Sequence, residues 1–144
     1  VHQPISIDLV DDEISGYLRR LLARLGDLTP VNRDMGEMLL NSHRRRFETQ
    51  TAPDGSPWAQ LSPGYKKRKK KNQDKILTLE GRLRGTLNYQ AGPFELLLGS
   101  PLIYAAAQHF GRPEINLPAR EILGLSDDDS AMLLDALGDW LLPA

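Results

Sequence analysis

The residues with the clearest chemical character are six consecutive cations. They are Lys66, Lys67, Arg68, Lys69, Lys70 and Lys71. Six adjacent positive charges can neutralise several phosphates of a nucleic acid, although such contacts do not read base sequence. Because like charges repel, the segment of about residues 63–76 is expected to be a mobile helix or loop. Three interpretations remain open: a surface that faces DNA or a protein partner, a solvated loop that only aids solubility, and, as the least specific, a nuclear-targeting signal.

The sequence contains no set of residues that specifies catalysis. Its three histidines are His2, His43 and His109. The cations beside His43 disfavour a charged imidazolium, and no acid at suitable spacing would orient that ring as a base. His109 follows an alanine run and is expected to be packed or at an interface rather than to bind a ligand. No P-loop, G-x-G-x-x-G, G-x-S-x-G or H-x-x-x-H pattern is present, so we expect no enzymatic activity, no metal and no cofactor.

Three consecutive acids follow Ser126. Asp127, Asp128 and Asp129 lack the glycine and the terminal glutamate of a calcium-binding loop. Ser126 is a favourable N-cap residue, and acids in a first helical turn interact well with the helix dipole. The acids are therefore expected to begin a C-terminal helix. Their charge also makes them candidates for an interface with another copy of the chain.

Composition indicates one globular domain over residues 1–144. Hydrophobic residues make up 40% of the chain and charged residues 26%, close to the average for such domains. The absence of cysteine excludes disulfides, thiolate zinc sites and cysteine nucleophiles. No apolar run approaches the ~18 residues of a membrane span, and the first residues do not resemble a signal peptide. We therefore expect no membrane partner.

Charge is unevenly distributed along the chain. The net charge is -1, but the segment from Arg33 to Arg84 has 13 basic and 6 acidic residues, a net of +7. The remainder has 5 basic and 13 acidic residues, a net of -8. This asymmetry favours a polyanionic partner for the middle of the chain, or copies that attract one another basic to acidic. Solvated faces without any partner are the alternative.

Hydrophobic spacing predicts helices at the start of the chain. Apolar side chains at helical spacing predict an amphipathic helix over residues 8–26, with Gly26 as its stop. Thr29 and Pro30 are expected as the N-cap and first residue of a second helix that runs to about residue 48.

Residues 49–63 cannot continue that helix, because residues 53–57 are rich in proline and glycine and are typical of a turn. Trp58 and Leu61 follow the turn. A tryptophan beside a turn usually packs into the core, so both residues are predicted to anchor this loop structurally.

The rest of the chain predicts an α+β fold. A β region is expected over 77–84, with strands at 86–91 and 94–99 joined by a Gly-Pro turn as an antiparallel pair. A helix at 101–110, an irregular loop at 112–118, a strand at 120–125 and a final helix after Ser126 follow. The expected architecture is a small antiparallel sheet packed by the N-terminal helices and a C-terminal helix, with a long basic loop.

Four stretches together resemble the virion morphogenesis family of tail-completion proteins in Mu-like tailed phages. They are Phe47 with PDGSPWAQLS at 53–62, ILTLEGRLR at 76–84, Tyr104-Ala105 with QHFG at 108–111, and LPAR at 117–120 followed by LGLS at 123–126. Their order and spacing match the family over nearly the whole chain. One departure is Glu121-Ile122, where the family often has Pro-Phe.

The resemblance implies a structural protein of the phage neck or tail top, without catalysis. Such proteins complete the tail and join it to the capsid as rings around the DNA path. The implied partners are other copies in a six-fold or twelve-fold ring, other neck and tail-terminator proteins, and packaged double-stranded DNA by non-specific contact. Assembly in the host cytoplasm is expected, and the virion is the expected location. The alternative function is a small nucleic-acid-binding module that acts through residues 66–71.

Overall fold

The computed structural model of the protein describes residues 12–79 and 81–142. Its elements in chain order are α1 (Asp12–Leu25), α2 (Thr29–Thr49), α3 (Pro63–Arg68), α4 (Arg82–Thr86), β1 (Asn88–Ala91), β2 (Leu96–Gly99), α5 (Ile103–Phe110), the 3-10 turn η1 (Pro113–Ile115) and α6 (Asp127–Leu141). The α+β class, with a small antiparallel sheet packed against helices, is confirmed.

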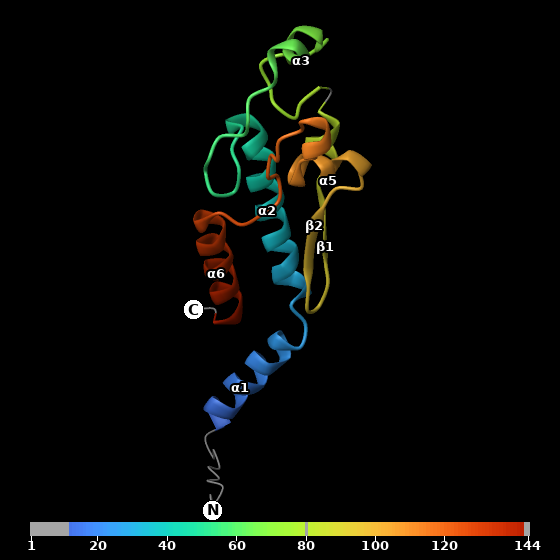
Figure 1. Cartoon of the computed structure of the whole chain (residues 1–144). Coiled ribbons are helices and arrows are strands. Elements are labelled where there is room, and N and C mark those ends of the chain that lie inside the picture. The colour runs from blue at the N-terminus through green and yellow to red at the C-terminus, as the bar shows by residue number, and fades with distance from the viewer. Residues whose placement is uncertain (1–11, 80, 143–144) are drawn as a thin grey trace, which may run out of the picture.

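The molecule is elongated along α2 (Figure 1). The hairpin of β1 and β2 lies on one side of α2, and α6 lies on another. α1 points away from this body at one end, while α3 projects at the opposite end (Figure 1). In the described part of the chain, no helix is both long and apolar enough to cross a membrane.

The hairpin presents one face to α2. β1 and β2 are antiparallel, with Tyr89 opposite Leu98 and Ala91 opposite Leu96. These four residues are partly buried, whereas Gln90 and Leu97 on the other face are exposed. This is the alternation of a strand pair with one packed face and one solvated face.

The N-terminal boundary of α2 differs from the prediction. The helix begins at Thr29, so Thr29 is not the N-cap residue, and Leu28 at that position supplies no capping side chain. Instead Asp27 Oδ1 accepts a hydrogen bond from the Thr29 amide at 3.0 Å. The short connection between α1 and α2 is as expected.

The predicted strand at 120–125 is wrong. This segment forms no ladder within the described residues, and its amides bond to other acceptors. The Arg120 amide donates to Gln108 O at 2.8 Å, and the Ile122 amide to His109 Nδ1 at 3.0 Å. The Gly124 amide donates to His43 Nε2 at 3.2 Å. Acceptors distant in sequence thus replace the neighbouring strand that apolar composition suggested.

The β region predicted at 77–84 is also wrong. Leu77 has a positive φ of 57°, which lies outside the β region, and residues Arg82–Thr86 form the short helix α4. The segment still contributes to the core through Leu83, which is buried.

The turn after α2 is held to the core by Trp58. The indole is 3% exposed and packs edge-on against Phe47 with a ring separation of 5.3 Å. Its Nε1 donates a hydrogen bond to Glu121 O at 2.9 Å, and Leu61 packs against the same cluster. The buried members of this cluster are Leu40, Phe47, Ala52, Trp58, Ile76, Leu83, Leu87 and Ile122.

Candidate functional site

Most of the cationic run lies on α3 and just beyond it. The Ser62 hydroxyl accepts a hydrogen bond from the Tyr65 amide at 3.3 Å and so caps α3. The exposed cations are Lys66, Lys67, Arg68, Lys70 and Lys71. Because α3 projects at one end of the molecule, these five charges form a basic surface there (Figure 1). We call this surface the basic end.

Lys69 does not belong to the basic end. Its side chain is buried, with the residue 5% exposed, and Nζ donates to the carbonyl oxygens of Asn72 at 2.7 Å and Lys75 at 2.5 Å. Burial lowers the pKa of Lys69, and the nearby Asp74 carboxylate opposes this shift. The two carbonyls compensate for lost hydration of the ammonium. The expectation that the whole run is solvated is therefore wrong for Lys69, which closes the turn over residues 69–75.

The acids after Ser126 begin α6 in a capping box. The Asp129 amide donates to Ser126 Oγ at 3.0 Å, and the Ser126 amide donates to Asp129 Oδ2 at 3.1 Å. Asp127 and Asp128 in the same first turn are exposed. This arrangement satisfies amides at the helix start and places acids at the positive end of the dipole.

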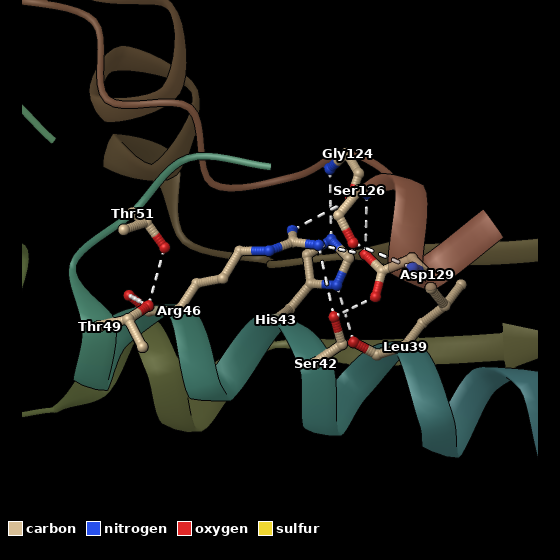
Figure 2. Close-up of polar contacts among 9 residues, drawn as sticks. All are labelled: Leu39, Ser42, His43, Arg46, Thr49, Thr51, Gly124, Ser126 and Asp129. Carbon is tan, nitrogen blue, oxygen red and sulfur yellow. Dashed lines mark hydrogen bonds and ion pairs between the residues drawn. The ribbon is translucent and has the colours of Figure 1, made fainter. Parts of the chain in front are cut away.

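Asp129 forms a buried ion pair with Arg46 of α2 (Figure 2). Arg46 also donates from Nη1 to Gly124 O at 3.0 Å, and Ser42 Oγ donates to Asp129 Oδ1. Arg46 is 7% exposed and Asp129 4%. Asp129 is thus an internal link between α2 and α6 rather than a contact for another copy. The proposed subunit interface retains only Asp127 and Asp128 of the three acids.

The surroundings of Asp129 keep it ionised. Burial alone would raise the pKa of this carboxyl. The hydrogen bonds from Ser42 and Ser126 and the charge of Arg46 outweigh that effect and hold the pKa below its usual value of 3.8. Asp129 is therefore charged at neutral pH, and both of its carboxylate oxygens already accept hydrogen bonds.

Two histidines act as acceptors for the backbone of residues 120–125. His43 is 1% exposed, and its Nδ1 lies 2.7 Å from Leu39 O (Figure 2). Because Nε2 accepts the Gly124 amide, His43 is neutral with its proton on Nδ1. His109 Nδ1 accepts hydrogen bonds from the amides of Ile122 and Leu123. The ring is therefore packed within the chain, which was one of the two placements predicted for it. His2 lies outside the described residues.

A groove next to the basic end was not predicted from the sequence. Its volume is about 760 Å³, and it is formed by residues from 60–69, 77–83, 104–108 and 116–120. Its lining includes Arg120, which is buried and donates to Ala59 O at 2.8 Å and Gln60 O at 3.1 Å. The side-chain oxygen of Gln108 in the same groove is buried without a hydrogen-bond partner. Only the fold brings these distant segments together, so no local sequence signal marks the groove.

The described residues hold no cluster of histidine and carboxylate side chains suited to a metal ion. The chemistry that the surface does offer is electrostatic and apolar contact: a basic end, exposed acids on α6, and a groove lined by leucine and tyrosine side chains.

Comparison with known proteins agrees with an assembly role. Residues 9–142 match the model of the phage virion morphogenesis family. The chain is 31% identical over 145 residues to the "Putative capsid assembly protein G" of Escherichia phage Mu, covering 89% of this chain and 92% of that protein. It is 30% identical over 111 residues to the "Mu-like prophage FluMu G protein 1" of Haemophilus influenzae, covering 74% and 75%. No solved structure matches the chain. The chain therefore belongs to the phage virion morphogenesis family, a family of phage structural and assembly proteins.

Proposed function

We propose that the protein acts at the head–tail junction of a phage particle, in the virion neck or tail top. There it completes the tail and joins it to the capsid as a ring of identical copies around the DNA path. The observation that carries the proposal is the separation of opposite charges on one chain. The basic end lies around α3, whereas Asp127 and Asp128 lie on α6 beside α2 (Figure 1).

Such a separation favours head-to-tail contacts between copies. Two different surfaces of the same chain can then meet repeatedly, and a repeated heterologous contact closes into a ring when its rotation permits. Opposite charges guide this register and disfavour contacts between like surfaces. The basic end is also suited to a lumen that contains DNA, because cations bind phosphates without regard to base sequence.

The test is deletion of the gene from its phage, followed by electron microscopy of the products. We expect separate filled heads and tails, or defective tails, while DNA replication continues in the host cytoplasm. Normal joined particles together with failed DNA synthesis would contradict the proposal. In the wild-type particle, electron microscopy of the neck should show the chain as a ring, next to other neck and tail-terminator proteins.

A second candidate is a small nucleic-acid-binding module, which the five exposed cations of the basic end favour. Binding of purified protein to double-stranded DNA at increasing salt measures this activity, since each phosphate contact steepens the salt dependence. An assembly component should form defined oligomers or bind neck proteins without DNA. A chain that binds DNA tightly but never associates with itself or with neck proteins would favour the module.

A further inference from the structure

α6 presents an exposed stripe that combines acids with an apolar side chain. Asp127, Asp128, Leu134, Asp135 and Asp139 are all exposed, and Leu134 is 69% exposed. Spacings of seven residues, from Asp127 to Leu134 and from Asp128 to Asp135, and of four residues, from Asp135 to Asp139, place them along one side of the helix. We call this stripe the outer face of α6.

The outer face has no cover within the described residues. The partly buried apolar residues of α6, including Leu133 and Leu137, occupy the other side of the helix, and α6 packs against α2. α1 contacts α6 near its C-terminal end, where Arg24 Nη1 donates to Trp140 O at 2.7 Å. The outer face therefore offers a neighbour one large apolar side chain, Leu134, flanked by four carboxylates.

The groove beside the basic end has complementary properties. Leu79, Tyr104 and Leu117 give it an apolar lining, and the exposed Arg82 adds a cation to its wall. Tyr65 and the buried Lys69 also line it, so the exposed cations adjacent to them in sequence lie close to its edge. The groove can therefore accept an apolar side chain that is flanked by acids.

The two surfaces of one chain do not face each other. α6 lies beside α2, whereas the groove lies near α3 and α5 towards the opposite end from α1 (Figure 1). The occupant that fits the groove is consequently the outer face of α6 from a second copy. DNA fits less well, because phosphates would pair with the cations but would leave the apolar lining without a partner.

We infer that the outer face of α6 docks into the groove of a neighbouring copy, with Leu134 against the apolar lining and Asp135 and Asp139 against the cations of its rim. This inference rests on the proposed ring and names the two surfaces that would build it. The contact is heterologous, so each copy uses its α6 for one neighbour and its groove for the other.

Cysteine cross-linking tests the contact directly, because the chain contains no cysteine. The double variant Leu134→Cys with Leu79→Cys, oxidised at high protein concentration, should give a ladder of covalent oligomers under denaturing conditions. Each single variant should give dimers at most, and mixing the two single variants should give the mixed dimer. The matched control is Leu134→Cys with Leu97→Cys, since Leu97 is exposed on the hairpin outside the groove. A missing ladder, or an equal ladder from the control, would overturn the inference.

Charge reversal provides an independent test in the cysteine background. Asp135→Lys with Asp139→Lys should abolish the ladder, and so should Lys66→Glu with Arg82→Glu. An equimolar mixture of the two reversed proteins should restore it, because each reversed surface then meets an opposite charge on the other protein. The control Asp34→Lys with Glu95→Lys changes two exposed acids outside α6 and should leave the ladder intact. Failure of the mixture to restore cross-linking would count against charge pairing at this contact.

The two proposals can fail separately. If the cross-links are absent while electron microscopy shows a ring in the neck, only the assignment of the contacting surfaces is wrong. If the ladder forms in solution but the chain is absent from the neck, the contact is real and the proposed location is wrong.

Discussion

The ring of Tyr89 in β1 lies directly against the backbone of Gly36 in α2. A β-carbon built on Gly36 would come within 2.4 Å of Tyr89 Cδ2. The tyrosine hydroxyl donates a hydrogen bond to Oε1 of the next residue of α2, Glu37, at 2.8 Å. A glycine in the middle of α2 is therefore the condition for close packing between this helix and the hairpin, despite its low helix propensity.

Replacing Gly36 with alanine should destabilise the protein. The new methyl group must displace the tyrosine ring or the helix, and such overpacking costs about 1–3 kcal/mol, partly offset by alanine's better helix propensity. Denaturant unfolding measures the change. The matched control is Gly138→Ala in α6, where an added β-carbon meets no atom within 4 Å and should stabilise the helix slightly. Equal effects of the two substitutions would contradict this account.

Trp58→Ala should cost about 3–5 kcal/mol of unfolding free energy, since the substitution empties a site in the core. Trp58→Phe keeps part of the aromatic volume and loses the hydrogen bond to Glu121 O, so it should cost less. Trp140→Ala serves as the control, because Trp140 is only partly buried. An unchanged denaturation midpoint for Trp58→Ala would contradict the anchoring role.

Features encoded by neighbouring residues were predictable from the sequence. Ser126 followed by three acids indicated the start of α6, and the Gly-Pro pair at 92–93 indicated the hairpin. Both depend on hydrogen bonds and backbone preferences within a few residues. The turn before Trp58 belongs to the same class, because proline and glycine restrict the chain locally.

Features that depend on distant partners were not predictable. Residues 120–125 have the composition of a strand, but His43 and His109 from other elements accept their amides. Lys69 resembles its neighbours in sequence, and only the carbonyls of Asn72 and Lys75 distinguish it. The same holds for Asp129, whose partner Arg46 lies 83 residues earlier. Identical residue types within one run can therefore have opposite roles.

His43 should make stability depend on pH between neutrality and mild acid. Burial lowers its folded-state pKa below 6.5, with Arg46 acting in the same direction and the Leu39 carbonyl and Asp129 opposing it. At a pH between the folded-state and unfolded-state pKa values, His43 therefore binds a proton in the unfolded chain but not in the folded protein. The contribution of His43 to the unfolding free energy is fully present above about pH 6.5. It is lost as the pH falls below that value, by at most about 1.4 kcal/mol per pH unit.

The measurement for His43 is denaturant unfolding at about pH 7.5 and about pH 5.5. His43→Gln retains polar atoms without titrating in this range, so the variant should lose the part of the pH dependence that His43 supplies. Asp129 does not interfere, because its pKa lies below 3.8. A variant with the same pH dependence as the wild type would show that His43 is not the responsible group.

The last prediction concerns the basic end. Replacing Lys66, Lys67, Arg68, Lys70 and Lys71 with serine, while keeping the buried Lys69, should change the unfolding free energy by less than about 1 kcal/mol, because solvated side chains contribute little. The same protein should fail to support joining of heads and tails, measured as particle yield in a phage that supplies only this variant. A matched control replaces five other exposed cations with serine and should preserve the yield: Arg19, Arg20, Arg33, Arg45 and Lys75.

If the variant with five serines at the basic end gives the particle yield of the wild type, only a solubilising role remains for these five cations. If the yield falls, changing the four exposed acids of α6 together to lysine in the otherwise unchanged chain separates the two remaining partners: Asp127, Asp128, Asp135 and Asp139. Direct pairing between copies predicts a comparable defect, because these acids are exposed on the outer face of α6 and available to a neighbour. Contact of the basic end with packaged DNA predicts little change, since phosphates rather than these acids would neutralise the cations. Asp129 stays unaltered in this test, because its loss would leave Arg46 buried without its partner.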